Sequence, residues 1–287
     1  MINNNLNYVK PISIFLLLSI IAIISTIIFS NSQNVAYAHT FSGDESASFL
    51  TLIEEISTGS HLIEKSLINN ATLAQRIAEH ISQLVTPEHL EEISEKNKLV
   101  ANSLNESLYD LENSFNFTNK IAPSEIKQKI KNLDDILGEV VSVRIENEQL
   151  TNDTVNALVL NDLIGKALQS YDKALGIKSD EHSEEHESEN IKENDGQDIK
   201  VKIVNQVEYQ IAQALFNKSI EKFNELKPLI TSNMSNLSTT LESSLVQLRN
   251  AVDNKESFEV IDDIIDRQVT PHLESIFKIK IEEEKEK

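Results

Sequence analysis

The chain has 287 residues, with 26 basic and 46 acidic side chains and a formal net charge of −20 at pH 7. This acidity disfavours binding to nucleic acid and to anionic lipid, because both carry negative charge. The lack of cysteine excludes disulfides, thiolate metal sites and a cysteine nucleophile, and the presence of only six glycines and five prolines predicts long helices with short connections.

The first predicted element is a targeting segment over residues 1–38. A polar start precedes residues 12–29, which are apolar apart from scattered serine and threonine, and Ala36-Tyr37-Ala38 follows a short polar stretch. Small residues at this spacing are typical of a signal-peptidase site, so we expect a signal peptide cleaved after Ala38. The alternative is an uncleaved anchor, since about 18 apolar residues can just span a bilayer. Under either interpretation the rest of the chain is extracytoplasmic, secreted or anchored, and only residues 12–29 enter a membrane.

The apolar spacing that follows is helical and predicts a first four-helix unit over residues 44–150. Its predicted helices cover residues 44–68, 70–85 and 87–114, and a fourth begins with Ser124 as its N-cap. Thr86-Pro87 is typical of a helix start, with threonine as N-cap and proline at the first helical position.

A second four-helix unit is predicted over residues 153–280. Its helices are expected to begin near Asp153 and then to cover residues 201–227, 233–253 and 256–280. An acidic run with almost no apolar side chain, residues 178–199, predicts a flexible insert, and the chain closes with a charged tail over residues 281–287. Pro271 falls inside the last predicted helix, so it must kink that helix or restart it with Thr270 as cap.

Internal repetition links the two units. The segment ANSLNESLYDLEN at 101–113 matches STTLESSLVQLRN at 238–250, and NLDDIL at 132–137 matches VIDDII at 260–265. Matching segments in the same order indicate two copies of one unit. We therefore predict an all-α fold of two repeated four-helix units, either a double helical bundle or a continuous eight-helix array.

Several catalytic motifs are missing from the sequence. It contains no glycine-rich phosphate loop, no G-x-S-x-G elbow and no H-E-x-x-H motif. We therefore expect a protein that is not an enzyme and that has no catalytic residues and no resident cofactor. Metal ligands and surfaces remain as the candidate functional features.

Histidines near the cleavage site and in the insert are candidate ligands for copper or zinc. Cleavage after Ala38 would make His39 the amino terminus, whose α-amine and imidazole together chelate Cu(II). His182 and His186 are spaced i, i+4 and would share one helix face, a spacing that suits Zn(II), Cu(II) or Ni(II). The alternatives are an ordinary residue exposed by cleavage, and a disordered segment that binds metal only opportunistically.

His80 lies on an apolar stripe with Leu73 and Ile77, so we expect it to face inward. A buried histidine usually has one neighbouring acceptor, and the plain interpretation is a core histidine of this kind; the alternative is a metal ligand inside the bundle. The candidate partner is a carboxylate on a facing helix, such as Asp134, or Asp262 in the second unit. Three further histidines are expected to be surface or capping residues: His61, His89 and His272.

Asparagine-linked glycosylation is the modification that the sequence favours. N-x-S/T sequons occur at Asn70, Asn105, Asn116, Asn152, Asn217, Asn233 and Asn236. In a chain with an export segment, this number of sequons predicts a glycosylated surface.

Three segments resemble a group of exported helical proteins of ammonia-oxidising archaea: AYAHTFSGDESASF at the predicted cleavage site, NNATLAQRIAEH at 69–80 and VVSVRIENEQL at 140–150. The resemblance covers most of the exported chain and implies an envelope location and a helical fold, without an activity. A second histidine accompanies the match to His80 in that group. Ile77 stands there in this chain, which weakens a metal site in this helix.

The sequence thus favours a non-enzymatic, exported or membrane-anchored helical module of the cell envelope. It would bind an envelope protein or itself, or serve a structural role. The alternative is an extracytoplasmic metal-handling protein that carries copper or another divalent cation. A sensor ectodomain is a third interpretation, which the roughly eleven residues before the apolar segment disfavour.

Overall fold

The computed structural model describes residues 45–115, 122–176 and 201–281, which all belong to the second of the two units into which the chain divides, Ala38–Lys287. Every regular element in these ranges is a helix, and none is a strand. The all-α prediction is therefore confirmed.

Several predicted segments lie outside the described residues. These are the targeting segment over residues 1–38, the acidic insert over residues 178–199 and the charged tail apart from Ile281. Among the helices that the structure does describe, none combines the length and the apolar character needed to cross a bilayer.

The first helices follow the predicted stripes closely. They are α2 (Glu45–Leu67), α3 (Ala71–Leu84), α4 (Pro87–Asn113) and α5 (Pro123–Arg144). Asn70 caps α3 by accepting a hydrogen bond from the Leu73 amide at 3.0 Å, which satisfies a donor that the helix cannot. The predicted cap at Thr86 is confirmed, because its side chain accepts from the amide of His89. The predicted cap at Ser124 is wrong: α5 begins one residue earlier with Pro123, whose fixed φ suits a first helical position.

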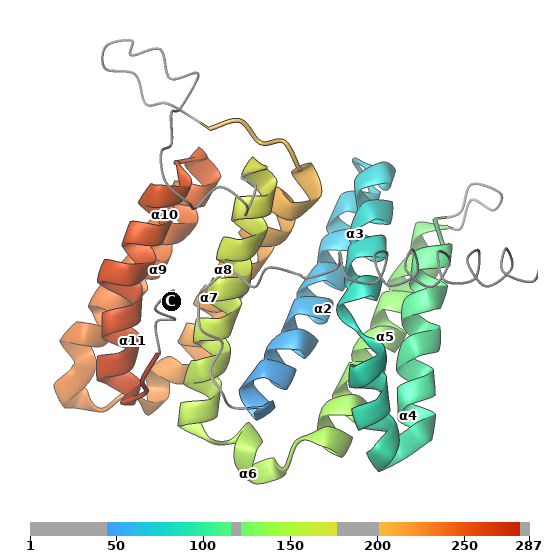
Figure 1. The fold of residues 1–287 in the computed structure, drawn as a ribbon, viewed down its shortest axis with the longest axis horizontal. Helices are drawn as coiled ribbons and strands as arrows, with labels where there is room; N and C mark the ends of the chain where they lie inside the picture. Colours follow the sequence, from blue (N-terminus) through green and yellow to red (C-terminus); the bar gives the residue numbers. More distant parts are fainter. Residues whose placement is uncertain (1–44, 116–121, 177–200, 282–287) are drawn as a thin grey trace, which may run out of the picture. The chain divides into compact units, whose positions relative to one another are not determined.

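The predicted continuous helix over residues 87–114 is interrupted at Asn97. The backbone of Asn97 is extended, with φ −154° and ψ 102°, and this residue divides α4 into residues 87–96 and residues 98–113. Its side-chain oxygen accepts hydrogen bonds from the amides of Leu99 and Val100, so Asn97 serves as an N-cap inside the helix. The chain changes direction at this point (Figure 1).

The next helices are α6 (Asn147–Leu150), α7 (Asp153–Leu175), α8 (Gln206–Leu226) and α9 (Ser235–Asn254), with two 3₁₀ turns, η2 (Lys227–Leu229) and η3 (Ser232–Met234), before α9. Helix α7 ends at Gly176, whose positive φ of 72° closes the helix in the left-handed conformation. Helix α8 starts later than the predicted residue 201, because Asn205 caps it by accepting from the amides of Val207 and Glu208.

The last helical stretch runs through α10 (Phe258–Ile264), the π turn η4 (Ile265–Val269) and α11 (Thr270–Phe277). Of the two alternatives expected at Pro271, the restart with Thr270 as cap is wrong, because the Thr270 amide donates to the Ile265 carbonyl, five residues earlier, and α11 has no side-chain cap. Pro271 has no N–H to offer to the carbonyl four residues before it. The wider π turn accommodates this missing hydrogen bond, so the chain stays helical across the proline.

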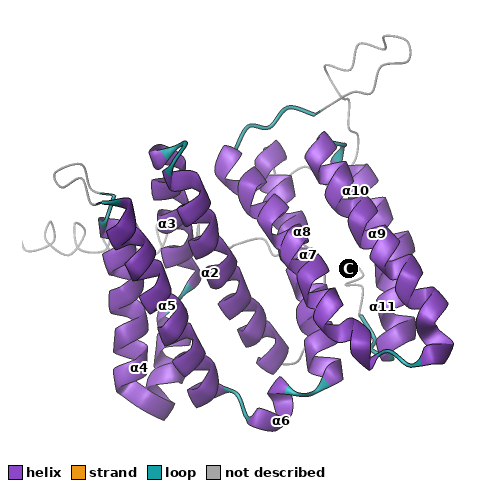
Figure 2. Ribbon diagram, turned by 180° about the vertical axis from the view of Figure 1, so that it is seen from behind, coloured by secondary structure: helices purple, strands orange, loops and turns teal. Residues whose placement is uncertain are grey.

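Each set of helices packs in a ring. In the first set α2 contacts α3, α3 contacts α4, α4 contacts α5, and α5 returns to α2 (Figures 1 and 2). In the second set α7 contacts α8, α8 contacts α9, α9 contacts the α10–η4–α11 stretch, and this stretch returns to α7. The two sets meet where α2 contacts α7 and α8 and where α3 contacts α8. We call this contact the seam.

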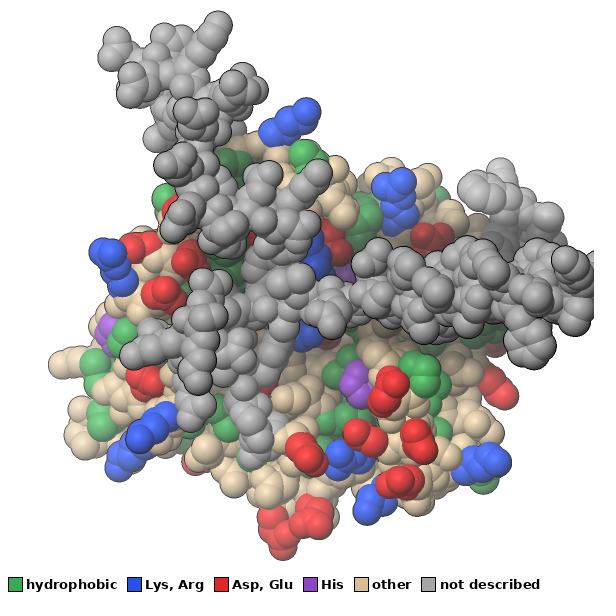
Figure 3. Space-filling model, viewed as in Figure 1, with side chains coloured by type: hydrophobic (Ala, Val, Ile, Leu, Met, Phe, Trp, Pro, Cys, Tyr) green, Lys and Arg blue, Asp and Glu red, His purple; other side chains and the backbone are tan. Residues whose placement is uncertain are grey.

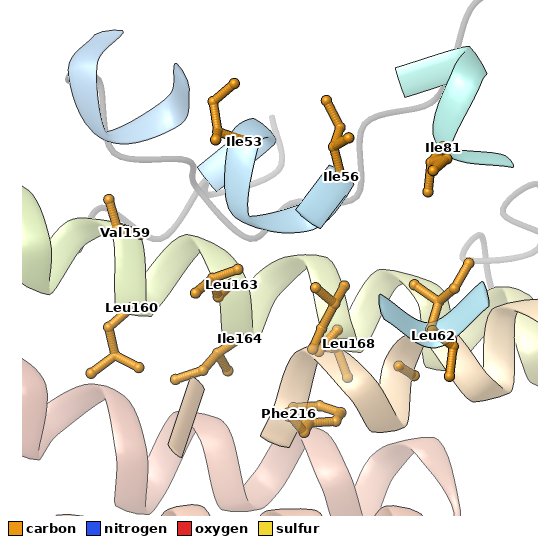
Figure 4. Packing of buried hydrophobic residues seen from close by; sticks show 14 of the residues in the cluster. Ile53, Ile56, Leu62, Ile81, Val159, Leu160, Leu163, Ile164, Leu168 and Phe216 are labelled. Carbon is orange, nitrogen blue, oxygen red and sulfur yellow. The ribbon is translucent and has the colours of Figure 1, made fainter. Parts of the chain in front are cut away.

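One hydrophobic cluster extends through both sets and across the seam. Figure 4 shows Ile53 and Ile56 of α2 above Leu163 and Leu168 of α7, with Phe216 of α8 below them. Burying one such side chain contributes about 1.5–3 kcal/mol. The seam is therefore part of the core that holds the described residues together.

Candidate functional site

The seam holds charged side chains as well as apolar ones. Two ion pairs cross it, Glu54 Oε2 to Lys218 Nζ at 3.0 Å and Glu55 Oε2 to Lys166 Nζ at 3.8 Å. A histidine–carboxylate contact also crosses it, His80 Nδ1 to Glu208 Oε1 at 3.5 Å. Burial of charge is costly unless the charge is paired, so these contacts are the strongest candidates for a functional or specificity-setting site.

The pair of His80 and Glu208 joins α3 to α8. The apolar stripe of α3 turns His80 inward, as predicted, and its side chain is only 19% exposed. Glu208 lies in the first turn of α8, where the positive end of the helix dipole favours a carboxylate. His80 Nε2 and Glu208 Oε2 are buried and lack a hydrogen-bond partner among the described residues.

The other two pairs link α2 to α7 and α8. Glu55 is 6% exposed, and its carboxylate faces Lys166. Burial alone would lower the pKa of Lys218. The charge of Glu54, the hydrogen bond to Glu54 and the charges of Glu221 and Glu225 outweigh this effect, so the pKa of Lys218 is raised. The lysine charge is therefore stabilised where it crosses the seam.

Asp134, the expected partner of His80, lies elsewhere. Its Oδ2 is 3.6 Å from His61 Nε2, and its Oδ1 accepts a hydrogen bond from the Ser57 hydroxyl at 3.4 Å. Burial raises the pKa of this carboxyl despite the nearby His61 and Ser57. Neither candidate partner, Asp134 or Asp262, is therefore the partner of His80, which contacts Glu208. His61 is exposed, as expected, and contacts Asp134, a partner that the sequence did not indicate.

Ser57, His61 and Asp134 do not form a nucleophilic triad. His61 Nδ1 donates to the backbone carbonyl of Ser57 at 2.8 Å, and the Ser57 hydroxyl donates to Asp134. A nucleophilic serine needs its hydroxyl bonded to the imidazole, which acts as the base. This cluster instead ties α2 to α5.

Two further histidines act in capping or local bonding. His89 Nδ1 accepts from the Thr86 amide at 3.2 Å and completes a capping box with histidine in the place of glutamate, so its predicted capping role is confirmed. His272 Nδ1 bonds the Gln268 carbonyl inside the last helical stretch.

No group of three or more metal-binding side chains exists within residues 45–115, 122–176 and 201–281. His80 and Glu208 supply two ligand types that suit zinc or copper, whereas structural zinc sites use four protein ligands. The other candidate ligands, His39, His182 and His186, lie outside the described residues.

Six of the seven predicted sequons lie in described segments, and the asparagine of each is exposed: Asn70, Asn105, Asn152, Asn217, Asn233 and Asn236. Asn116 lies outside the described residues. Figure 3 shows that acidic side chains on the visible face are interspersed with basic ones.

Sequence patterns identified His80 but missed its partner and the other seam charges. One signal for Glu208 exists: it precedes Ile211 and Leu215 at successive spacings of three and four, and all three side chains are buried on one face of α8.

Comparisons of the chain with protein-family models, curated proteins and solved structures give no match.

Proposed function

We propose that this protein is an exported or membrane-anchored, non-enzymatic helical module of the cell envelope, with a binding or structural role. The observation that carries the proposal is the order of its segments. The apolar residues 12–29 and the small-residue motif ending at Ala38 precede a helical fold that begins at Glu45. A cut after Ala38 would therefore leave every described helix intact. The resemblance of the same stretch to exported archaeal proteins supports the same location.

The seam charges support a structural or binding role over catalysis. Glu54, Glu55 and His80 each face a group of complementary chemistry on a neighbouring helix, so these pairs hold the helices in register. Catalytic groups must face a reactant. The module would bind through its outer helical faces, with an envelope protein or a second copy as partner.

We also propose that the two rings of helices are copies of one four-helix unit. The match of 101–113 with 238–250 falls on the second part of α4 and on α9, which occupy corresponding places in the two rings. Matched leucines are buried in both copies: Leu104 and Leu241, Leu108 and Leu245, Leu111 and Leu248. The two helices also start at corresponding positions. Asn97 precedes the second part of α4 and Met234 precedes α9, and these two residues are separated by the same number of positions as each pair of matched leucines.

Fractionation of native cells tests the proposed location, with intact mass as the readout. A chain that begins at His39 in the envelope or medium supports a secreted module, and a membrane-bound chain that keeps residues 1–38 supports an anchored one. A chain that keeps residues 1–38 and stays in the cytoplasm contradicts the proposal. For a secreted or anchored chain, cross-linking at the cell surface would identify the partner.

The second candidate is metal handling. The pair of His80 and Glu208 favours it, because His80 Nε2 and Glu208 Oε2 are buried and have no hydrogen-bond partner among the described residues. A metal carrier gains thermal stability when a stoichiometric ion binds. The test is the melting temperature with copper, zinc, nickel and ferrous iron, for the native protein and for His80→Leu. A shift that is lost in His80→Leu supports this candidate. Unchanged melting with all four ions excludes it.

A further inference from the structure

The described sequons fall into two classes according to the hydroxyl residue at their third position. N-linked glycosylation requires both the asparagine and this serine or threonine. An enzyme that acts on a folded chain must therefore reach both side chains. All six asparagines are exposed, so the third position separates the sites.

In the first class the hydroxyl residue is exposed. The members are Asn70 with Thr72, Asn152 with Thr154 and Asn233 with Ser235. All three sequons lie at helix starts, where the chain enters a helix from a turn. Asn70 and Asn152 are N-caps with non-helical backbone, and Asn233 lies in the 3₁₀ turn η3 just before α9.

In the second class the hydroxyl residue is buried. The members are Asn105 with Ser107, Asn217 with Ser219 and Asn236 with Ser238, and these serines are 8%, 0% and 4% exposed. All three sequons lie within helices, in α4, α8 and α9. The Ser219 hydroxyl donates to the Leu215 carbonyl, and Asn217 Nδ2 donates to the Gln213 carbonyl at 2.8 Å. Both groups that a transferase needs at Asn217 are thus committed to the helix.

We infer that Asn70, Asn152 and Asn233 carry N-linked glycans, and that Asn105, Asn217 and Asn236 do not. The inference rests on the proposed function, since only an exported chain meets the transferase. The donor is an oligosaccharide esterified to a lipid-linked phosphate or pyrophosphate. A bond forms between asparagine Nδ2 and the sugar C1, the C1–O bond breaks, the phosphate leaves with its electron pair, and the amide proton passes to a base of the transferase.

Glycans at these sites are compatible with the helix caps. Asn70 Oδ1 accepts from the Leu73 amide, and Asn152 Oδ1 accepts from the amides of Thr154 and Val155. A glycan attaches to Nδ2 and leaves Oδ1 in place. The two caps therefore persist in the modified protein, and the sugars extend into solvent from the starts of α3 and α7.

The test is site-resolved glycopeptide mass spectrometry of the full chain from its own cells. The informative variants are Thr72→Ala, Thr154→Ala and Ser235→Ala, because each removes a sequon and keeps its asparagine. Each variant is expected to lose one glycan mass with its melting temperature little changed. Thr72→Ser keeps the sequon and serves as the matched control, which should keep its glycan.

Specific results would overturn the inference. One is occupancy of Asn105, Asn217 or Asn236 equal to that of the first class, which would mean transfer before folding. Another is an exported chain that starts at His39 and lacks glycans at all three first-class sites; this leaves the proposed location standing. A cytoplasmic chain that keeps residues 1–38 and has no glycan overturns both proposals.

Discussion

Gly59 of α2 and Ile81 of α3 approach so closely that a Cβ built on the glycine would lie 2.3 Å from Ile81 Cγ2. This contact lies inside the first ring of helices, where both residues are buried. Gly59 is therefore needed for packing, although glycine inside a helix costs about 0.5–1 kcal/mol relative to alanine.

We expect Gly59→Ala to lower the free energy of unfolding by about 1–3 kcal/mol, because overpacking forces the two helices apart. The matched control is Gly138→Ala in α5, where an added Cβ meets nothing within 4 Å. That variant should stabilise by about 0.5–1 kcal/mol. Urea unfolding of both variants measures the difference, and equal effects would contradict the close approach.

The seam pair should show energetic coupling. Glu208→Ala leaves His80 buried beside an empty site, and we expect a loss of about 1–3 kcal/mol in the free energy of unfolding. The double variant with His80→Leu should lose less than the sum of the two single variants, because no polar group is then left unpaired. Additive losses in a double-mutant cycle would show that the two side chains do not interact.

Tyr171 should make the protein sensitive to alkali. Its hydroxyl donates to the Glu256 carbonyl at 2.6 Å, and burial, with Tyr209 and Glu256 nearby, raises the pKa of this phenol. A raised pKa in the folded state gives stability that is complete below the ordinary value of 10.0 and is lost as the pH rises towards the folded value.

Tyr171→Phe is expected to cost about 1 kcal/mol at neutral pH, from the lost hydrogen bond. Above pH 10.0 its stability should fall less steeply than that of the native protein. Urea unfolding across this pH range is the measurement, and Tyr109→Phe, which removes an exposed phenol, is the control. Parallel pH profiles for Tyr171→Phe and the native protein would count against the buried phenol.

Asp134 should give the opposite of the usual carboxylate behaviour. Its pKa is raised, chiefly by burial, so its contribution to stability is complete below the ordinary value of 3.8 and is lost as the pH rises through the folded value. Asp134→Asn cannot ionise. Its stability relative to the native protein should therefore increase as the pH rises from the ordinary value of 3.8 through the higher folded value. Asp135→Asn, at the exposed neighbour paired with Lys131, is the control, and a relative stability of Asp134→Asn that decreases with pH would contradict the assignment.

The helices were predictable because their apolar stripes repeat every three to four residues. The break at Asn97 was not, since EKNK around it is compatible with a continuous helix. Pro271 signalled a distortion, but sequence could not distinguish a restart from a π turn. The burial of Gly59 against Ile81 depends on a neighbouring helix and leaves no local pattern.

For the candidate site, sequence predicted a direction but not a partner. The stripe of α3 turned His80 inward, yet Glu208 lies 128 residues further along the chain, and only the contact of α3 with α8 brings the two together. Asp134 was a plausible partner because it is a carboxylate on another helix of the same unit, but it contacts Ser57 and His61 of α2 instead. Partner choice is set by which helices touch, and spacing along one helix does not contain that information.

The asparagine caps affect how the protein ages chemically. Asparagine slowly deamidates in water through a cyclic succinimide, which opens mainly to isoaspartate and partly to aspartate. An aspartate at position 205 would still offer a side-chain oxygen to the amides of Val207 and Glu208, and its charge would lie at the positive end of α8. Deamidation of Asn205 to aspartate would therefore leave this helix start intact, whereas the isoaspartate product, whose backbone is one methylene longer, would displace the oxygen that caps α8.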